Sequence, residues 1–141
     1  MSDAHVFRAP MRARERDALP GAGAEFGLEH GVVGIGDEVG RRLERFAGLP
    51  DGSFVWTRDA DGLHHLGRIA GPWRRDDTPA ARAVGIVNVR PARWLAEPIP
   101  EDDVPTAVLA TFARGGRNLQ RIHDARVAPA TAALWDAAGG G

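Results

Sequence analysis

The sequence predicts an α+β fold in which helices flank a small, strongly bent β-sheet that approaches a barrel. Apolar and polar residues alternate over residues 53–58, and a turn signal at Asp61-Gly62 leads into a second stretch of β character. Helical apolar spacing occurs before and after these stretches. The expected order is therefore strand, helix, hairpin, strand, helix, with no internal repeat.

Length and composition limit the possibilities further. The 141 residues suffice for one domain over residues 1–141, in which 1–30 form a poorly defined N-terminal segment and 139–141 a frayed tail. Cysteine is absent, which excludes disulfides, thiolate nucleophiles and Cys-based zinc sites and fits a cytoplasmic location. No apolar run approaches the ~20 residues of a membrane span, and no signal peptide is expected.

The charge is nearly balanced overall but uneven along the chain. The net charge is −1, and all 18 basic residues are arginine. A GC-rich coding bias explains much of this arginine content, yet the guanidinium fork suits phosphates and base edges better than lysine does. Residues 82–96 contain three arginines and no acid, and residues 104–126 contain four arginines against Asp124 alone. The near-zero net charge would hide a basic face, so it does not exclude one.

The N-terminal third contains three expected elements. Residues 5–8 form a short candidate strand, and residues 20–23 have loop chemistry. The β-branched run Gly31–Gly36 predicts a strand that another backbone approaches closely. Its glycine spacing does not match a dinucleotide-binding fingerprint. Residues 37–46 have helical spacing, and Gly48 ends that helix.

The middle of the chain is predicted to be β. In the strand 53–58, Phe54 and Trp56 share one face. The second strand of the hairpin covers residues 63–70 and is broken by Gly71-Pro72. Residues 74–82 are interpreted as a polar loop, and a longer strand rich in Val and Ile follows over 84–95.

The last third is predicted to be helical. Pro100 to Asp103 supply acids and a candidate N-cap, and Pro105 suits the first turn of a helix whose apolar stripe ends at Gly115-Gly116. Residues 117–126 are short and mixed in character. Pro129 begins a closing helix whose Trp135 is expected in the core.

Several stretches occurring in this order resemble a known family. The strand 31–36 is similar to an opening strand, residues 51–58 and 66–73 to a family hairpin, and residues 82–95 followed by Ile99-Pro100 to a strand that leads into a helix. Together they resemble the EVE-like domain of the PUA superfamily, a group of PUA, EVE, ASCH and YTH-like β-barrels. The resemblance covers residues 31 to about 122.

The resemblance implies a compact PUA-like barrel with flanking helices and a pocket that accepts an extruded base. It implies a nucleic-acid partner, with DNA favoured and RNA second, and it implies no cofactor. Such domains occur beside nucleases and NTPases in modification-dependent restriction systems, so a partner protein of that kind is expected. Asp37 stands where the family usually has a tryptophan; a carboxylate cannot stack on a base, although it can accept a hydrogen bond from an amino group.

Four residues are the candidates for the base pocket: Gly36, Asp37, Trp56 and Trp73. A tryptophan that stacks on a base contributes about 1–3 kcal/mol. Core packing is the competing interpretation for each tryptophan, Trp94 included. Trp73 is the best pocket candidate, because it follows Gly71-Pro72 at the end of a strand.

The candidate nucleic-acid-binding segment follows the helix end at Gly115-Gly116. Glycines allow close backbone approach, arginines suit phosphate, and amides suit base edges. The alternative is a capped helix followed by a solvated turn. The candidate residues are Arg114, Arg117, Asn118, Gln120 and Arg121. Arg82, Arg90 and Arg93 are weaker candidates, because a charge on a strand face is usually solvated.

The pattern contains no catalytic or metal-binding constellation. His64 and His65 alternate across a strand and cannot both face one metal ion. His123 and Asp124 are adjacent and lack the usual orienting geometry of a dyad, and no serine is placed to complete a triad.

Together these features favour a reader module that binds a modified base, methylated or hydroxymethylated, in DNA by base extrusion. Two alternatives remain open. One is an ASCH-like enzyme that acts on RNA or on modified nucleosides with the polar residues of the same pocket. The other is a protein-interaction scaffold domain, which the near-zero net charge permits.

Overall fold

The computed structural model describes residues 4–12, 19–116 and 118–140. In these residues the strands are β1 (Val6–Arg8), β2 (Val32–Ile35), β3 (Phe54–Arg58), β4 (His64–Ile69), β5 (Arg74–Arg75), β6 (Asn88–Trp94) and β7 (Gln120–Arg121). The helices are α1 (Ala22–His30), α2 (Arg41–Ala47), α3 (Pro79–Val84), α4 (Thr106–Ala113) and α5 (Val127–Ala137), with a 3₁₀ helix at Glu101–Asp103. None of the described helices is long and apolar enough to cross a bilayer.

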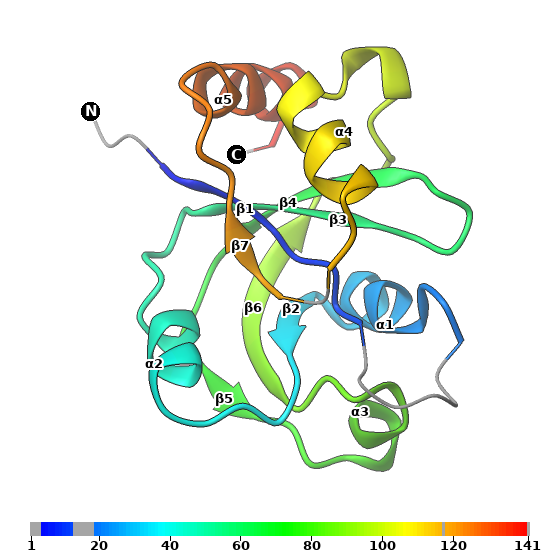
Figure 1. Cartoon of the computed structure of the whole chain (residues 1–141), viewed down its shortest axis with the longest axis vertical. Coiled ribbons are helices and arrows are strands. Elements are labelled where there is room, and N and C mark those ends of the chain that lie inside the picture. The colour runs from blue at the N-terminus through cyan, green and yellow to red at the C-terminus, as the bar shows by residue number, and fades with distance from the viewer. Residues whose placement is uncertain (1–3, 13–18, 117, 141) are drawn as a thin grey trace.

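The described strands form one mixed, strongly curled sheet with the order β2-β6-β4-β3-β1-β7. The pairing is antiparallel except between β1 and β3, which are parallel. The short strand β5 pairs with Asn88 and Val89 at the start of β6, and β4 pairs with residues 92–94 at its end. Figure 1 shows β6 as the long curved strand of this half-barrel, with β2 and β7 in front of it. The predicted α+β class with a bent sheet and flanking helices is confirmed.

Two apolar clusters occupy the two faces of the sheet, as the period-two alternation of strands requires. Val55 of β3 belongs to the inner cluster, with Phe26, Ile69 and Ile86. Its neighbours Phe54 and Trp56 belong to the outer cluster, where Trp135 of α5 is also buried. The prediction that Phe54 and Trp56 share a face, and the core position of Trp135, are therefore confirmed.

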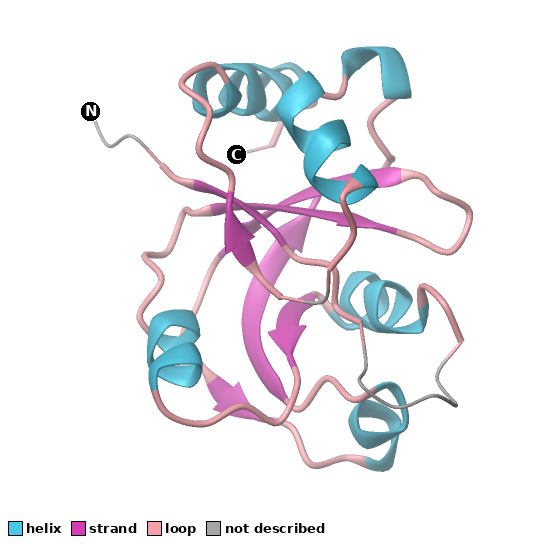
Figure 2. Cartoon of the chain, viewed as in Figure 1, coloured by secondary structure: helices cyan, strands magenta, loops and turns pink. Residues whose placement is uncertain are grey.

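The helices divide between the two faces of the sheet. In Figure 2, α4 and α5 lie together above the sheet, whereas α1, α2 and α3 lie below it around the lower part of β6. Val108 and Phe112 of α4 pack into the outer cluster, and Phe46 of α2 packs into the inner one. This arrangement leaves the two ends of the curl, β2 and β7, without further strand partners among the described residues.

Local sequence signals located the central strands correctly. The hairpin β3–β4 has the predicted turn, with Phe54 opposite Arg68 and Arg58 opposite His64. The predicted close approach at the glycine-rich strand occurs at Gly34, where an added Cβ would lie 2.8 Å from the carbonyl oxygen of Asn88.

Several predicted boundaries were wrong. Residues 74–82 are not a loop, because they contain β5 and most of α3, which begins where Thr78 Oγ1 accepts a bond from the Ala81 amide at 3.2 Å. The strand predicted from residue 84 therefore starts at Asn88. Helix α1 begins at Ala22, so that the loop expected at 20–23 is confirmed only for residues 20 and 21. Helix α2 begins at Arg41, and Val39, which precedes it, is 79% exposed.

The expectation of a solvated Arg90 was also wrong. Its side chain is 3% exposed and donates from Nε to the Gly71 carbonyl at 2.6 Å and from Nη1 to the Phe46 carbonyl at 2.9 Å. Nη2 reaches Asp51 at 2.9 Å. A charged group is tolerated inside a protein when its donors are satisfied, and here Arg90 ties β6 to the end of α2 and to the break after β4.

His64 makes stability depend on pH. Burial, followed by the charge of Arg58, lowers the pKa of His64 from 6.5, and Nε2 has no hydrogen-bond partner among the described residues. Above pH 6.5 the ring is neutral in both states. As the pH falls below 6.5, the unfolded chain takes up the proton first, so the free energy of unfolding decreases.

We expect the decrease between pH 7 and pH 5 to be smaller in His64→Gln than in the wild type. Urea unfolding at each pH measures it. His5→Gln, which changes an exposed histidine, is the control and should keep the wild-type dependence on pH. Equal pH dependence in His64→Gln and the wild type would contradict this explanation.

Candidate nucleic-acid interface

A cleft of about 1900 Å³ lies at the open side of the half-barrel, between the two ends of the curled sheet. Gly34 and Ile35 of β2 line it on one side, and Gln120 and Arg121 of β7 line it on the other. Figure 1 shows why these segments meet: the sheet curls round until its first and last strands both reach the same side of the molecule. The cleft is therefore a consequence of incomplete barrel closure.

Apolar side chains line part of the cleft between these two strands. They come from the inner cluster and its margin, namely Phe7, Ile35, Phe46, Leu49, Ile86 and Leu119. Phe7 and Phe46 are only 7% and 2% exposed. The cleft thus contains apolar side chains beside polar ones, as ligand-binding sites do.

The wall that follows β2 carries two of the predicted pocket residues, Gly36 and Asp37. Asp37 accepts a bond from Arg75 Nη1 at 2.7 Å, and this bond lowers the pKa of Asp37. Arg75 also donates to Asp77 at 3.0 Å, and Asp77 in turn accepts from Arg82 at 2.8 Å. Asp37 is therefore an ionised carboxylate that is fixed by an exposed chain of ion pairs rather than a free acid.

Trp73 connects to this wall without lining the cleft. Its indole N–H donates to Asn88 Oδ1 at 3.0 Å, and Asn88 Nδ2 donates to the Gly36 carbonyl at 2.7 Å. Asn88 is fully buried, whereas Trp73 is 40% exposed. Trp73 therefore acts through Asn88 to fix the backbone at Gly36, and its ring remains on the surface beside β5.

Trp56, predicted to line the base pocket, does not line the cleft. It is completely buried in the outer cluster, and its indole N–H donates to Thr131 of α5 at 3.3 Å. Because β3 places Trp56 on the face covered by α4 and α5, the ring cannot line the cleft on the inner face. The core interpretation applies to this tryptophan.

The opposite wall runs from the end of α4 to β7 and carries the predicted binding segment. Arg114, Asn118, Gln120 and Arg121 all line the cleft, and all four are exposed. Arg117, the remaining member of the predicted set, lies outside the described residues. The structure thus brings the predicted binding segment to the same cleft as Gly36 and Asp37, although about eighty residues separate the two in sequence.

Arg8 of β1, which sequence reasoning missed, fixes this second wall. It is 5% exposed, and its Nη1 donates to the carbonyls of Thr111 at 2.9 Å and Gly115 at 2.7 Å. Its Nε donates to the Asn118 carbonyl at 3.3 Å. A single arginine thereby ties β1 to both ends of the turn that carries Arg114, because the guanidinium presents several donors in a fixed plane.

Gly116 allows this arginine to occupy its place. Its φ is +115°, and an added Cβ would lie 2.5 Å from Arg8 Nη2, whereas a Cβ on Gly115 (φ +75°) would meet nothing within 4 Å. We expect Gly116→Ala to lower the free energy of unfolding by about 2–3 kcal/mol, against about 1 kcal/mol for Gly115→Ala. Urea unfolding of both variants measures the difference, and equal losses would show that the contact with Arg8 has no effect.

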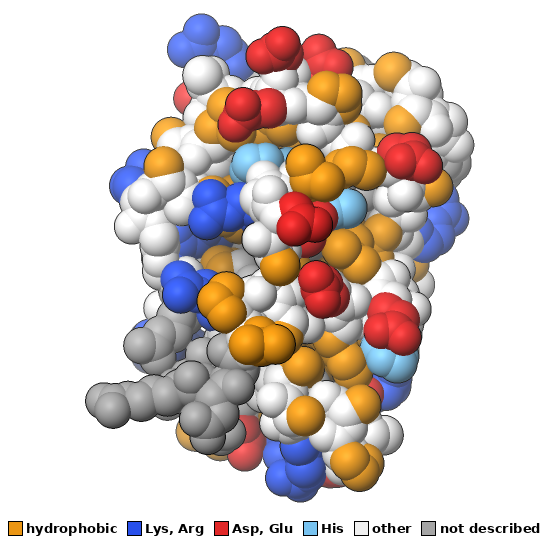
Figure 3. Space-filling model, turned by 90° about the vertical axis from the view of Figure 1, so that its right-hand side faces the viewer, with side chains coloured by type: hydrophobic (Ala, Val, Ile, Leu, Met, Phe, Trp, Pro, Cys, Tyr) orange, Lys and Arg blue, Asp and Glu red, His pale blue; other side chains and the backbone are white. Residues whose placement is uncertain are grey.

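The charges around the cleft favour an anionic ligand. Among the described residues that line it, six are arginines and three are acids; the arginines are Arg12, Arg42, Arg45, Arg82, Arg114 and Arg121, and the acids are Asp37, Glu38 and Asp124. Figure 3 shows the side of the molecule that is on the right in Figure 1. Acidic side chains are scattered among hydrophobic ones across the middle of this side, and several basic side chains lie toward its left-hand edge. That edge is the side that faces the viewer in Figure 1. A basic surface on a nearly neutral protein is thus present at the cleft.

His123 and Asp124, whose adjacency lacks the orienting geometry of a catalytic dyad, also line the cleft. Asp124 Oδ1 accepts from the backbone N–H of Arg126 at 2.8 Å, which is a turn-forming bond. Within the described residues no group of three or more His, Asp or Glu side chains could hold a metal ion.

Comparison with known proteins places the fold. No protein-family model matches the chain, and no curated protein matches it. Among solved structures, the chain resembles the YTH domain of the Zygosaccharomyces rouxii MRB1 protein, determined in complex with N6-methyladenosine RNA. The TM-score is 0.53 at 13% sequence identity, over 94% of this chain and 86% of that one. The chain therefore shares its curled half-barrel fold with a domain that binds a modified nucleic acid.

Proposed function

We propose that this protein is a reader module that binds a nucleic-acid strand across the arginine-lined cleft and admits one modified base into it. The observation that carries the proposal is that a single cleft collects Gly36 and Asp37 from one end of the sheet and residues 114–121 from the other. Six arginines and an apolar lining provide separate places for phosphates and for a base.

The proposed mechanism follows from the chemistry of the two walls. Exposed Arg114 and Arg121 neutralise backbone phosphates, and the amides of Asn118 and Gln120 offer both donors and acceptors to base edges. Extruding a base costs a few kcal/mol of lost stacking and pairing, least for a single strand. Contacts with the apolar lining and with Asp37, which accepts hydrogen bonds from amino groups, recover this cost.

The fold supports a reader rather than an enzyme. The YTH domain that resembles this chain was solved with methylated RNA, and the sequence itself resembles EVE-like domains. The proposal covers DNA, which the sequence resemblance favours, and RNA, which the structural neighbour binds. A module of this kind produces no chemical change, so we propose that a partner protein, such as a nuclease or an NTPase, acts on what it recognises.

Fluorescence anisotropy with labelled oligonucleotides tests the proposal. The panel contains single-stranded and duplex DNA with cytosine, 5-methylcytosine, 5-hydroxymethylcytosine or N6-methyladenine, and RNA with adenosine or N6-methyladenosine, at two salt concentrations. We expect one modified strand to bind at least about tenfold more tightly than its plain counterpart, a difference of ~1.4 kcal/mol. Equal, purely salt-dependent binding of all strands would overturn the reader function.

A further inference from the structure

A second pocket, of about 280 Å³, adjoins the cleft. It lies between the start of α1, the β3–β4 hairpin and the end of α4. Pro10, Arg12 and Gly116 line both the pocket and the cleft, so the two are neighbours around the same turn. A ligand that occupies the cleft is therefore next to the pocket, separated from it by these shared residues.

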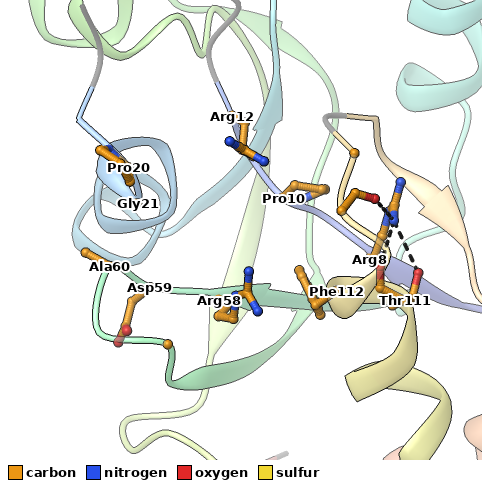
Figure 4. Close-up of a pocket in the computed structure, with 13 residues that line it drawn as sticks. Arg8, Pro10, Arg12, Pro20, Gly21, Arg58, Asp59, Ala60, Thr111 and Phe112 are labelled. Atoms are coloured by element: carbon orange, nitrogen blue, oxygen red, sulfur yellow. Dashed lines mark hydrogen bonds between the residues drawn. The ribbon is translucent and has the colours of Figure 1, made fainter.

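Three arginines line this pocket: Arg8, Arg12 and Arg58. In Figure 4, Arg12 and Arg58 come from opposite sides of the pocket, and Arg8 lies beyond Pro10 with its bonds to Thr111 and to the turn drawn as dashed lines. Arg58 lies over the ring of Phe112, with its Cζ 5.6 Å from the ring centre. Each guanidinium thus comes from a different strand or loop.

The positive charge of these arginines is not neutralised by carboxylates of the described residues. Arg8 is 5% exposed, yet its bonds go to carbonyl and hydroxyl oxygens, and its Nη2 has no hydrogen-bond partner among the described residues. Burial, followed by the charge of Arg114, lowers the pKa of Arg8. In the described part of the chain, Arg12 and Arg58 form no ion pair either.

Among the described residues that line the pocket Asp59 is the one acid, and its oxygens already accept hydrogen bonds. Oδ1 accepts from the backbone N–H groups of Asp61 and Leu63 at 2.9 and 3.0 Å, and Oδ2 lies 2.8 Å from His65 Nε2. Its carboxylate therefore organises the hairpin turn rather than pairing with an arginine. Among the described residues that line the pocket, this single carboxylate stands against three guanidinium groups.

We propose that this pocket binds one phosphodiester phosphate of the same strand whose base enters the cleft, with Arg8 Nη2, Arg12 and Arg58 as its donors. This inference rests on the proposed function, because it assigns the partner group of the same ligand. Arginine suits this role because its planar fork binds phosphate oxygens in pairs. The contact would fix the position of the strand along the cleft without reading the base.

The test replaces phosphates one at a time by uncharged methylphosphonate linkages in the single strand that binds best. We expect one linkage near the modified base to weaken binding to the wild type about fivefold. In Arg58→Gln, the same substitution should have almost no further effect, because the partner of that phosphate is already lost. Arg58→Gln should also lower the slope of log affinity against log salt by about 0.7, the value for one phosphate on a single strand.

Arg93→Gln is the matched control, because Arg93 is an exposed arginine of β6 that lines neither the pocket nor the cleft. It should keep the wild-type affinity and the same sensitive linkage. Arg12→Gln provides a second variant and should abolish the effect of the same linkage. Arg58→Gln should leave the ratio of modified to plain binding unchanged, since a phosphate contact carries no base information.

The outcomes separate the two proposals. In one outcome the wild type prefers the modified strand, but every methylphosphonate linkage weakens binding equally in the wild type and in Arg58→Gln. The phosphate site is then overturned, and the reader function stands. In the opposite outcome one linkage weakens binding to the wild type but not to Arg58→Gln, while modified and plain strands bind equally. The reader function is then overturned, and the phosphate site is supported. If the wild type binds no strand, both are overturned.

Discussion

Replacing the buried Arg90 by methionine is expected to lower the free energy of unfolding by about 3–5 kcal/mol. Methionine retains most of the side-chain length but no donor. The carbonyls of Gly71, Phe46 and Ala47, which accept from Arg90 at 2.6, 2.9 and 3.2 Å, then lose their partner next to the inner cluster. Urea unfolding, with the same slope against denaturant in both proteins, measures the loss.

Arg93→Met is the matched control for this experiment. Arg93 lies three residues further along β6, but its side chain is exposed. A surface change of this kind alters stability by no more than about 0.5 kcal/mol. Losses of similar size at the two positions would show that the hydrogen bonds of Arg90 do not hold α2 and the β4–β5 break to β6.

The second large effect is on binding. We expect the double variant Arg114→Gln, Arg121→Gln to bind the preferred single strand about 30- to 100-fold more weakly at moderate salt. The slope of log affinity against log salt should decrease by about 1.4, because each phosphate that loses its arginine accounts for about 0.7 on a single strand. Anisotropy titrations at four or more salt concentrations give both numbers.

Two observations control this variant. Arg126 is exposed but does not line the cleft, so Arg126→Gln should reproduce the wild-type slope. The double variant should also unfold at the wild-type urea concentration, because Arg114 and Arg121 form no ion pair in the described part of the chain. An unchanged salt slope with intact folding would remove this wall of the cleft from the binding site.

The sequence was informative where a short local pattern determines the structure. Alternation around Phe54 and Trp56, with Asp61-Gly62 between the strands, fixed the hairpin and its faces. Gly34 revealed a close approach of backbone, and Gly115-Gly116 marked the end of α4. In each case the residues that specify the element lie within it or beside it.

Prediction failed where the partner of a residue lies far away in the chain. Arg8 and Arg90 look like ordinary strand arginines, yet the carbonyls that receive them lie 103 and 44 residues away. Without a contact map, a strand arginine is assigned to solvent by default. Helix α3 was missed for a different reason: Thr78-Pro79 is a helix-start signal that the polar composition of residues 74–82 obscured.

The candidate site shows the same division. Gly36 and Asp37 on one side, and Arg114, Gln120 and Arg121 on the other, were selected separately, and the curl of the sheet brings them to one cleft. The tryptophans could not be assigned in this way. Strand alternation gives two faces for Trp56 but does not say which face lies toward the cleft, and in the structure Trp56 is on the face that α4 and α5 cover.

The position of the bound base tests the central claim most directly. Amide ¹H–¹⁵N spectra of the labelled protein, recorded with the preferred modified strand and with its plain counterpart, locate it. The reader account predicts that the modified base adds shifts at the amides of Ile35, Gly36 and Leu119, which line the cleft, and none on α5. Shifts confined to other surfaces, or identical shifts with both strands, would contradict it.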